Sequence, residues 1–335
     1  MSKWYFEKGD KSDVVLSTRV RLARNLEDYP FPARLDAAGR STVNSLVKQA
    51  IFENNENDFK YIEMRSLSQL QAVSLAERHL ISPEFAMRHE GSALMLTDDE
   101  SISIMLCEED HIRLQVMKAG LALEEAYAAA DKLDTALDSR LNYAFDDRLG
   151  YLTQCPTNLG TAMRASVMLH LPALTQCGKI AGLASTVSKL GLTIRGAYGE
   201  GTSPTGDIYQ LSNQITLGIT EENAVANLES ITLQLVNQER SAAAELVRQP
   251  QVEDRIFRSL GLLKSARLLD TKEFMELISA VRLGAVRGIV DIGEEKINEL
   301  IVSMQPATIS AANEKAQTPE QRDAVRASAV RQALA

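Results

Sequence analysis

The chain has 335 residues, of which 45% are hydrophobic and 24% charged, a composition typical of globular proteins. Its net charge of −9 argues against nucleic acid or an anionic membrane as a partner, because both repel a negative surface. The three cysteines form no Cys-x-x-Cys pair, the histidines show no metal-binding spacing, and no secretory or membrane-spanning segment stands out. We therefore expect a cytoplasmic protein with neither a disulfide framework nor a metal held by protein ligands.

The first part of the chain alternates helical and strand patterns. Apolar spacing predicts helices over residues 35–54, with Asp36 as the N-cap, and 66–82, which we expect Pro83 to stop. Residues 92–97 and 101–117 are predicted to be neighbouring strands. Residues 121–141 follow as an amphipathic helix.

From residue 150 to 218, strand patterns alternate with glycine-rich joints and with a helix predicted over about 173–190. From about Glu221 the pattern is helical to the end, and residues 248–255 read as a boundary. The predicted fold class is α+β. We expect one domain over residues 1–248 and a small, all-helical domain over residues 249–335.

Arginine recurs in predicted strands and loops, whereas the motifs of P-loop enzymes and of protein kinases are missing. Five guanidinium groups brought together would suit a polyphosphate, because each offers forked donors to phosphate oxygens. Taken singly, each is more often an exposed or ion-paired arginine, and sequence alone does not show that they converge. The five are Arg19, Arg21, Arg113, Arg164 and Arg195.

Two acidic elements accompany these arginines. Glu108, Glu109 and Asp110 follow an apolar strand pattern, and Glu200 lies in a loop between glycines that could close over a substrate. The plainer interpretation makes all four solvated turn carboxylates.

Five segments occur in the order found in the catalytic domain of the phosphagen (guanidino) kinases. They are STRVRLARN, EEDHIRLQ, CPTNLGTAMRASVMLHLP, IRGAYGE and SNQITLG. The chain resembles that domain from about residue 13 to 240. Within the family it is most similar to the bacterial protein-arginine kinases, which phosphorylate arginine side chains during stress and mark proteins for a Clp-type protease. The resemblance implies an antiparallel sheet flanked by helices.

The resemblance also implies an ATP site in which arginines hold the phosphates and steady the phosphoryl group during in-line transfer. Mg²⁺ would be held mainly by the phosphates and water. The implied ATP contacts are Ser17, Thr18, Arg19, Val20, Arg21, His79, Arg113, Arg164, Ala165, Ser166, Val167, Met168, Arg195, Gly196, Ala197, Tyr198, Gly199 and Glu200.

A guanidinium acceptor has a pKa above about 12 and no lone pair available for attack, so it needs a carboxylate that fixes it and accepts its proton. The resemblance assigns Glu109 as the principal catalytic carboxylate and Glu200 as a second clamp. It also brings Cys155 near the acceptor as a positioning thiol, with an inert buried cysteine as the alternative. Cys107 stands where many relatives carry asparagine.

Two features favour a polypeptide acceptor. Kinases of free arginine or creatine carry an additional N-terminal helical domain, whereas the first motif begins here at Ser17. We therefore expect an open acceptor site that admits an arginine on a protein, and the negative net charge attracts basic segments.

The C-terminal residues predict a capped helix, with Thr318 as the N-cap, Pro319 at the first position and Gln321 completing a capping box. In the protein-arginine kinases the pattern RDxxRA forms a phosphoarginine pocket linked to regulation and dimer assembly. By resemblance, that allosteric pocket comprises Arg322, Asp323, Arg326 and Ala327. A solvated helix with an ordinary ion pair is the alternative.

The sequence thus predicts an ATP-dependent protein-arginine kinase that acts on proteins with exposed arginines. The expected partners are a Clp-type ATPase or protease, an activator protein and a second copy of the chain. Two alternatives remain at this stage: a kinase of free arginine or another small guanidine, and a non-catalytic adaptor that binds phosphoarginine.

Overall fold

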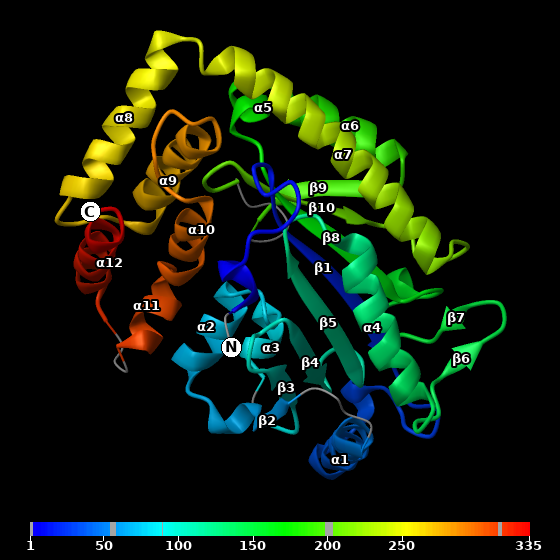
Figure 1. The fold of residues 1–335 in the computed structure, drawn as a ribbon. Helices are drawn as coiled ribbons and strands as arrows, with labels where there is room; N and C mark the ends of the chain where they lie inside the picture. The colour runs from blue at the N-terminus through cyan, green and yellow to red at the C-terminus, as the bar shows by residue number, and fades with distance from the viewer. Residues whose placement is uncertain (1–2, 54–57, 89, 198–203, 314–316) are drawn as a thin grey trace.

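The computed structural model describes residues 3–53, 58–88, 90–197, 204–313 and 317–335 (Figure 1). Within these residues, eight strands form one antiparallel sheet in the order β2-β3-β4-β5-β1-β8-β10-β9, and β6 and β7 form a small hairpin. The strands are β1 Val15–Arg24, β2 Phe59–Glu63, β3 Ala93–Thr97, β4 Ile102–Leu106, β5 Ile112–Ala119, β6 Phe145–Asp146, β7 Gly150–Tyr151, β8 Met163–His170, β9 Leu192–Gly196 and β10 Ile208–Asn213.

One face of the sheet packs on helices and forms the largest hydrophobic core. Val20 of β1 and Val167 of β8 contribute from the sheet, and both are fully buried or nearly so. Because successive strand residues point to opposite faces, these apolar positions leave the alternate residues of β1 and β8 for the other face. The helices of this layer are α1 Ala37–Glu53, α4 Leu123–Asp138, α5 Pro172–Gln176, α6 Ile180–Lys189 and α7 Glu221–Leu246.

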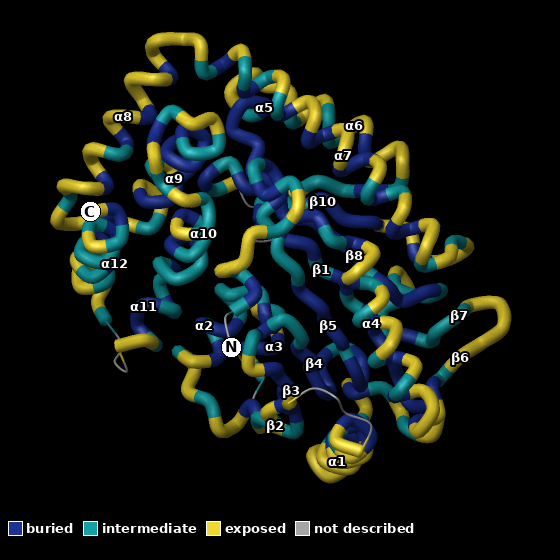
Figure 2. The backbone as a smooth tube through the Cα atoms, in the orientation of Figure 1, coloured by how far each residue is buried: buried dark blue, intermediate teal, exposed yellow. Residues whose placement is uncertain are grey.

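Among the described residues, helices cover the other face of the sheet at its two ends. A small core under α2 Gln69–Glu77 and α3 Pro83–Ala86 covers β3 and β4. At the opposite end, Met168 and Ile208 join a core built mostly by C-terminal helices. These helices are α8 Pro250–Ser265, α9 Thr271–Val286, α10 Glu294–Ser303, α11 Pro306–Ala312 and α12 Pro319–Ala333. Figure 2 shows the central strands buried and the outer surfaces of α7 and α8 exposed.

The predicted α+β fold class is confirmed: an antiparallel sheet flanked by helices is followed by helices alone. The Asp36 cap is also confirmed, since its carboxylate accepts a hydrogen bond from the Gly39 amide at 2.7 Å. The predicted boundary between residues 248 and 249 falls in the connection between α7 and α8.

Three predicted elements differ from the structure. Residues 101–117 form two strands, because Cys107, with φ of 55°, begins a turn between β4 and β5. The helix predicted over 173–190 is divided into α5 and α6 around Gly178, with φ of 66°. Pro83 begins α3 rather than ending the preceding helix, which stops at Glu77 just before His79 at φ of 62°.

Candidate active site

The register of the sheet gathers the predicted phosphate-binding arginines on one face. Arg21 of β1 lies directly opposite Arg164 of β8, and Arg19 lies opposite Ser166. On the other side of β1, Arg21 pairs with Gln115, which shares its face with Arg113 of β5. Because direct partners in an antiparallel pair point to the same face, these side chains converge.

The arginines on this face repel one another. Burial lowers the pKa of Arg21 well below its usual value, and the charges of Arg19, Arg113 and Arg164 lower it further. Burial and the charge of Arg113 likewise lower the pKa of Arg19 to about 10. The Nε of Arg21 is buried without a hydrogen-bond partner among the described residues. Such an arrangement attracts an anion, because an anion relieves both the repulsion and the unpaired donor.

Neighbouring side chains fix the directions of two of these arginines. Arg19 donates to the Gln210 side-chain oxygen at 3.0 Å. Arg164 donates to the carbonyl oxygens of Asn213 and Thr157, at 3.0 and 3.3 Å, and to the side chain of Asn158. The guanidinium of Arg164 therefore braces the turn that follows Cys155.

The remaining two predicted arginines, Arg113 and Arg195, lie on β5 and β9, on either side of the strands that carry the other three. Arg113 forms an ion pair with Glu108 at 2.9 Å. Arg195 of β9 is exposed, and its charge lowers the pKa of Arg164 after the larger effect of burial. All five predicted arginines thus belong to one side of the sheet.

The acidic turn between β4 and β5 lies beside the cluster. Burial raises the pKa of Glu109, the negative charges of Asp110 and Glu108 raise it further, and Arg113 and Arg88 oppose the rise. The charge of Arg113 affects the pKa of both Glu109 and Arg21, and Arg113 pairs with Glu108, the residue before Glu109. A carboxylate with a raised pKa is a better proton acceptor than an ordinary one.

Asp110 connects this turn to the segment that carries Cys155. Its Oδ1 accepts hydrogen bonds from the Asn25 amide at 2.7 Å and from the Gln154 backbone at 2.8 Å. Cys155 itself is half-buried and lies 3.1 Å from the hydroxyl of Thr157. The hydrogen bond between Asp110 and Gln154 thus holds the segments of Glu109 and Cys155 together at one end of the sheet.

Several other predicted ATP contacts share the arginine face, and others do not. Ser17, Ser166 and Met168 lie on it by register, and His79 lines a cavity there with Ser17 and Met168. Gly196 ends β9, and Ala197 lies in the core shared with the C-terminal helices. The side chains of Thr18, Val20, Ala165 and Val167 are buried on the opposite face. Tyr198, Gly199 and Glu200 lie outside the described residues.

The predicted phosphoarginine residues lie on α12, and the capping box formed by Thr318 and Gln321 is confirmed. Arg326 is fully buried and donates to the carbonyl oxygens of Met304 and Leu269, to Asp323 and to Thr271. Arg322 is only partly buried and donates to the Gln317 carbonyl oxygen at 2.7 Å. Ala327 is buried in the core of the C-terminal helices. Arg322 is therefore the arginine of this pair that reaches the surface.

The sequence prediction missed residues that orient the site. Glu108 was grouped with Glu109 as a turn carboxylate, yet it is buried and receives hydrogen bonds from Ser82 and the Glu109 amide. Gln210 was not singled out, although it holds Arg19. The alternation of side chains along a strand could have shown that Val20 and Val167 point away from the arginine face. The contact of Glu108 with Ser82 could not be predicted in this way, because it depends on long-range packing.

The described residues hold no group of three or more His, Cys, Asp or Glu side chains arranged for a metal ion. In the part of the chain that the structure describes, no helix combines the length and the apolar character needed to cross a bilayer.

Comparison with known proteins identifies the class. Residues 42–242 match the family model "ATP:guanido phosphotransferase, C-terminal catalytic domain". The fold of a lombricine kinase covers 71% of this chain and 69% of its own, with a TM-score of 0.63 and 24% identity, which supports the fold alone. The chain therefore contains the catalytic domain of an ATP:guanido phosphotransferase, a class of kinase for which ATP is the phosphate donor.

Residues 249–335 match a second model, "Protein-arginine kinase McsB C-terminal domain". The chain is 43% identical over 320 residues to the protein-arginine kinase of Caldanaerobacter subterraneus subsp. tengcongensis, covering 94% of this chain and 95% of that one. It is 42% identical over 338 residues to the protein-arginine kinase of Clostridium tetani, covering 100% and 99%. The chain belongs to the protein-arginine kinase family.

Proposed function

We propose that this protein transfers the terminal phosphoryl group of ATP to a guanidinium nitrogen of arginine side chains in other proteins. One observation carries the proposal: the register of β1 with β5 and β8 gathers partly buried arginines on one face of the sheet, where they repel one another, and the pKa of Glu109 in the neighbouring turn is raised. A triphosphate supplies the anion that such a face favours, and a guanidinium supplies the cation that Glu109 favours.

In the proposed reaction Arg19, Arg21 and Arg164 hold the phosphates in line with the acceptor and neutralise charge as the phosphoryl group moves. Mg²⁺ bound to the phosphates would neutralise a further part of their charge. The N–P bond forms as the bond to the ADP oxygen breaks. The guanidinium proton passes to Glu109, which is also the group that fixes the acceptor. We assign Glu200 as a second clamp and Cys155 as a positioning thiol.

We extend this proposal to the acceptor and to the biological role of the reaction. The two relatives are named protein-arginine kinases, and we propose protein arginine as the acceptor here and Clp-type proteolysis during stress as its outcome. We also propose a cytoplasmic homodimer that responds to an activator protein. In this scheme residues 1–248 form the catalytic domain and residues 249–335 a regulatory domain whose phosphoarginine pocket includes Arg322 and Asp323.

The test compares the unaltered chain with Glu109→Gln. The substitution removes the proton acceptor and keeps the size of the side chain, so we expect the transfer rate to fall by roughly 10²–10⁴-fold while ATP affinity changes little. Each variant is incubated with ATP and a basic test protein, and phosphoarginine is measured by mass spectrometry under conditions that preserve acid-labile phosphate. Glu84→Gln, an exposed carboxylate on α3, is the matched control.

Two results would contradict the proposal. An unchanged rate in Glu109→Gln would remove the assigned carboxylate from the chemistry. Phosphorylation of free arginine without labelling of the test protein would make the protein a kinase of small guanidines instead.

A further inference from the structure

An open pocket of about 490 Å³ lies between α1 and β2, the strand at one edge of the sheet. Its volume falls within the roughly 300–1,000 Å³ that is typical of pockets that bind ligands. Polar and apolar side chains both contribute to its lining. They include Ser41 and Asn44 of α1, Tyr61 and Glu63 of β2, and Gly91 and Ser92, which precede β3.

The alternation of side chains along β2 places this pocket on the helix-covered face of the sheet. Phe59 belongs to the main hydrophobic core that includes α1, and Tyr61 packs against it, whereas Ile62 packs against the small core under α2 and α3. Glu63 therefore points to the same side as Phe59 and Tyr61. The predicted phosphate-binding arginines lie on the other face, so the pocket is separate from them.

Asn44 leaves a hydrogen-bond acceptor unused in the wall of the pocket. Its side chain is buried, its Nδ2 donates to the Gly91 carbonyl oxygen at 3.0 Å, and its Oδ1 has no partner among the described residues. A buried acceptor without a donor costs free energy, and a ligand N–H group would remove that cost. Glu90, an exposed carboxylate, also lines the pocket and favours a ligand with positive charge.

Gly91 and Arg40 fix the wall that Asn44 contacts. Gly91 has φ of 69°, and a Cβ added there would lie 2.9 Å from the side chain of Arg40, so the position is suited to glycine. Arg40 donates to the carbonyl oxygens of Pro32 and Glu90, at 3.0 and 3.4 Å. These contacts hold the Gly91 carbonyl oxygen where it orients the Asn44 amide.

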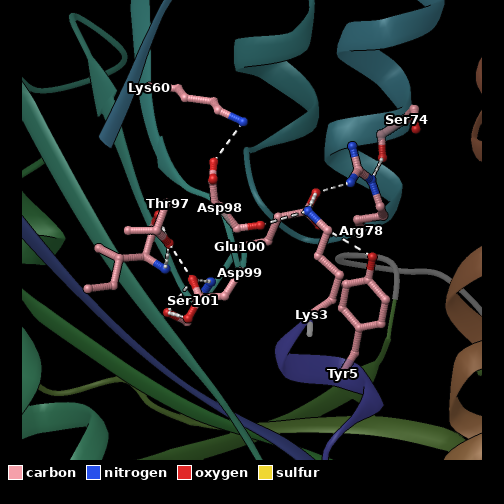
Figure 3. A network of polar contacts seen from close by, with 11 residues as sticks. Lys3, Tyr5, Lys60, Ser74, Arg78, Thr97, Asp98, Asp99, Glu100 and Ser101 are labelled. Carbon is pink, nitrogen blue, oxygen red and sulfur yellow. Dashed lines mark hydrogen bonds and ion pairs between the residues drawn. The ribbon is translucent and has the colours of Figure 1, made fainter. Parts of the chain in front are cut away.

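The far end of β2 is held by polar contacts with the turn between β3 and β4, as Figure 3 shows. Lys60 of β2 pairs with Asp98 of the turn at 2.7 Å, and the buried Glu100 of the same turn pairs with Arg78. Together with the ladder between β2 and β3, these contacts set the register of β2 and the side on which its residues line the pocket. The pocket is therefore largely preformed.

The pocket lies at the same end of the sheet as the acidic turn that carries Glu109. Glu63 pairs with Ala93 of β3, and Ala93 pairs with Leu106, the residue before that turn. Neighbouring strands are about 4.8 Å apart, so the backbone at Glu63 is about 10 Å from Leu106. An extended polypeptide covers this distance in about three residues. A client protein whose arginine lies at Glu109 can therefore reach the pocket with nearby residues of its own chain.

We propose that this pocket binds the residues of a client polypeptide that neighbour the phosphorylated arginine, and that one of their backbone N–H groups donates to Oδ1 of Asn44. The inference rests on the proposed phosphorylation of protein arginine and adds a second contact for the acceptor. An extended segment carries backbone N–H groups whatever its sequence, so this contact recognises a polypeptide rather than a particular side chain. Glu90 favours segments that contain further basic residues.

The first experiment fills the pocket from the helix side. Ser41 is exposed on α1, so Ser41→Tyr adds a ring to the lining without changing the core. Two acceptors are compared: a peptide with several residues on each side of a central arginine, and a single arginine blocked at both ends. We expect the KM of the peptide to rise about tenfold and those of blocked arginine and ATP to stay unchanged. Ser45→Tyr, an exposed position one turn further along α1, is the matched control and should change none of these constants.

The possible results separate this inference from the proposed function. An unchanged KM of the peptide in Ser41→Tyr would overturn the inference and leave the proposed function intact. An equal rise in the KM of blocked arginine would also overturn it, because the substitution would then act on the arginine site itself. Phosphorylation of neither acceptor by the unaltered chain would contradict the proposed function.

A second experiment tests the contact with Asn44 by binding alone. Each backbone N–H that flanks the arginine of the peptide is methylated in turn, and calorimetry measures binding of each peptide to the full-length protein. We expect one methylation to weaken binding about fivefold to tenfold in the unaltered chain and to have no effect in Asn44→Leu, which keeps the size of the side chain and removes its acceptor. Equal weakening in both proteins would overturn the role of Asn44. Ser41→Tyr, at an exposed position, tests the pocket even if Asn44→Leu does not fold.

Discussion

Buried arginines in the C-terminal helices differ from those on the sheet in what their guanidinium groups contact. Arg326 donates to two carbonyl oxygens, a carboxylate and a hydroxyl, and Arg282 donates to two carbonyl oxygens and to Asn298. Arg19 and Arg21 instead lie among other arginines: Arg19 has the Gln210 side chain as an acceptor, and Arg21 retains a buried N–H without a partner among the described residues.

The difference separates structural arginines from ligand-binding ones. A buried guanidinium whose donors are occupied by protein oxygens joins segments and stabilises the fold. A group of guanidiniums that repel one another costs stability, and an anionic ligand would offset that cost. The residue type is the same in both regions, although Arg282 and Arg326 are fully buried and Arg19 and Arg21 only partly so, and the partners of each donor carry the distinction.

The largest effect that separates the two regions is expected from Arg21→Gln. Loss of the central guanidinium removes a contact to the transferring phosphoryl group, and we expect the rate of protein-arginine phosphorylation to fall roughly 10³-fold or more. The free energy of unfolding should not decrease, because a buried charge next to like charges is removed. Phosphotransfer assays and urea titrations measure the two quantities. Arg248→Gln, at an exposed position, is the control and should alter neither quantity. A loss of stability in Arg21→Gln that equals, as a free energy, its loss of transition-state stabilisation would remove the distinction between the two regions.

The opposite outcome is expected for Arg326→Met. The substitution leaves the carbonyl oxygens of Met304 and Leu269 and the carboxylate of Asp323 without their donor, and we expect a loss of about 3 kcal/mol in the free energy of unfolding. Urea denaturation of the full-length chain measures the loss. Arg322→Ala is the control on the same helix, because Arg322 is partly exposed and should leave stability almost unchanged. Unaltered stability in Arg326→Met, together with lost phosphoarginine binding, would move Arg326 into the ligand-binding group.

A smaller effect concerns the histidines that accompany each set of arginines. Burial lowers the pKa of His79, to about 4, and that of His170 well below its usual value; the charges of Arg19 and Arg282, respectively, lower them further. The unfolded chain, whose histidines titrate near 6.5, then binds more protons than the folded one below that pH. Stability should therefore be complete above about pH 6.5 and decrease as the pH falls toward 4.

Urea titrations at pH 7.5 and 5.5 measure this decrease, and we expect about 1 kcal/mol from each histidine. His170→Gln should reduce the difference between the two pH values by about that amount. An unchanged difference in this variant would show that His170 is equally protonated in the folded and unfolded chains.

Local sequence patterns were sufficient to locate most helices and strands and to recognise the order of the motifs. The 3.6-residue period and the cap of Asp36 located α1, and the capping box of Thr318 located the beginning of α12. They failed where a backbone with positive φ interrupts an apolar run, as at Cys107 and Gly178. A strand or helix period continues through such a residue in the sequence, although the chain turns there.

The candidate site was only partly accessible to the same reasoning. Arg19, Arg21, Arg113 and Arg164 were identified from motifs, yet their convergence depends on the register of β1 with β5 and β8. The neighbouring apolar cavity, which Trp4 and Asn298 line, was not predicted, because neither residue belongs to a local motif. Their association follows from the packing of α10 against the N-terminal turn, nearly 300 residues away in sequence.

The sequence by itself determined most of the helices and strands, the family and the candidate phosphate-binding residues, because propensity, caps and motif order are local properties of the chain. Only the tertiary structure decided which arginines lack protein acceptors and which segments enclose the apolar cavity. Both depend on which distant groups meet, and a guanidinium is identical in the sequence whether carbonyl oxygens or other cations surround it.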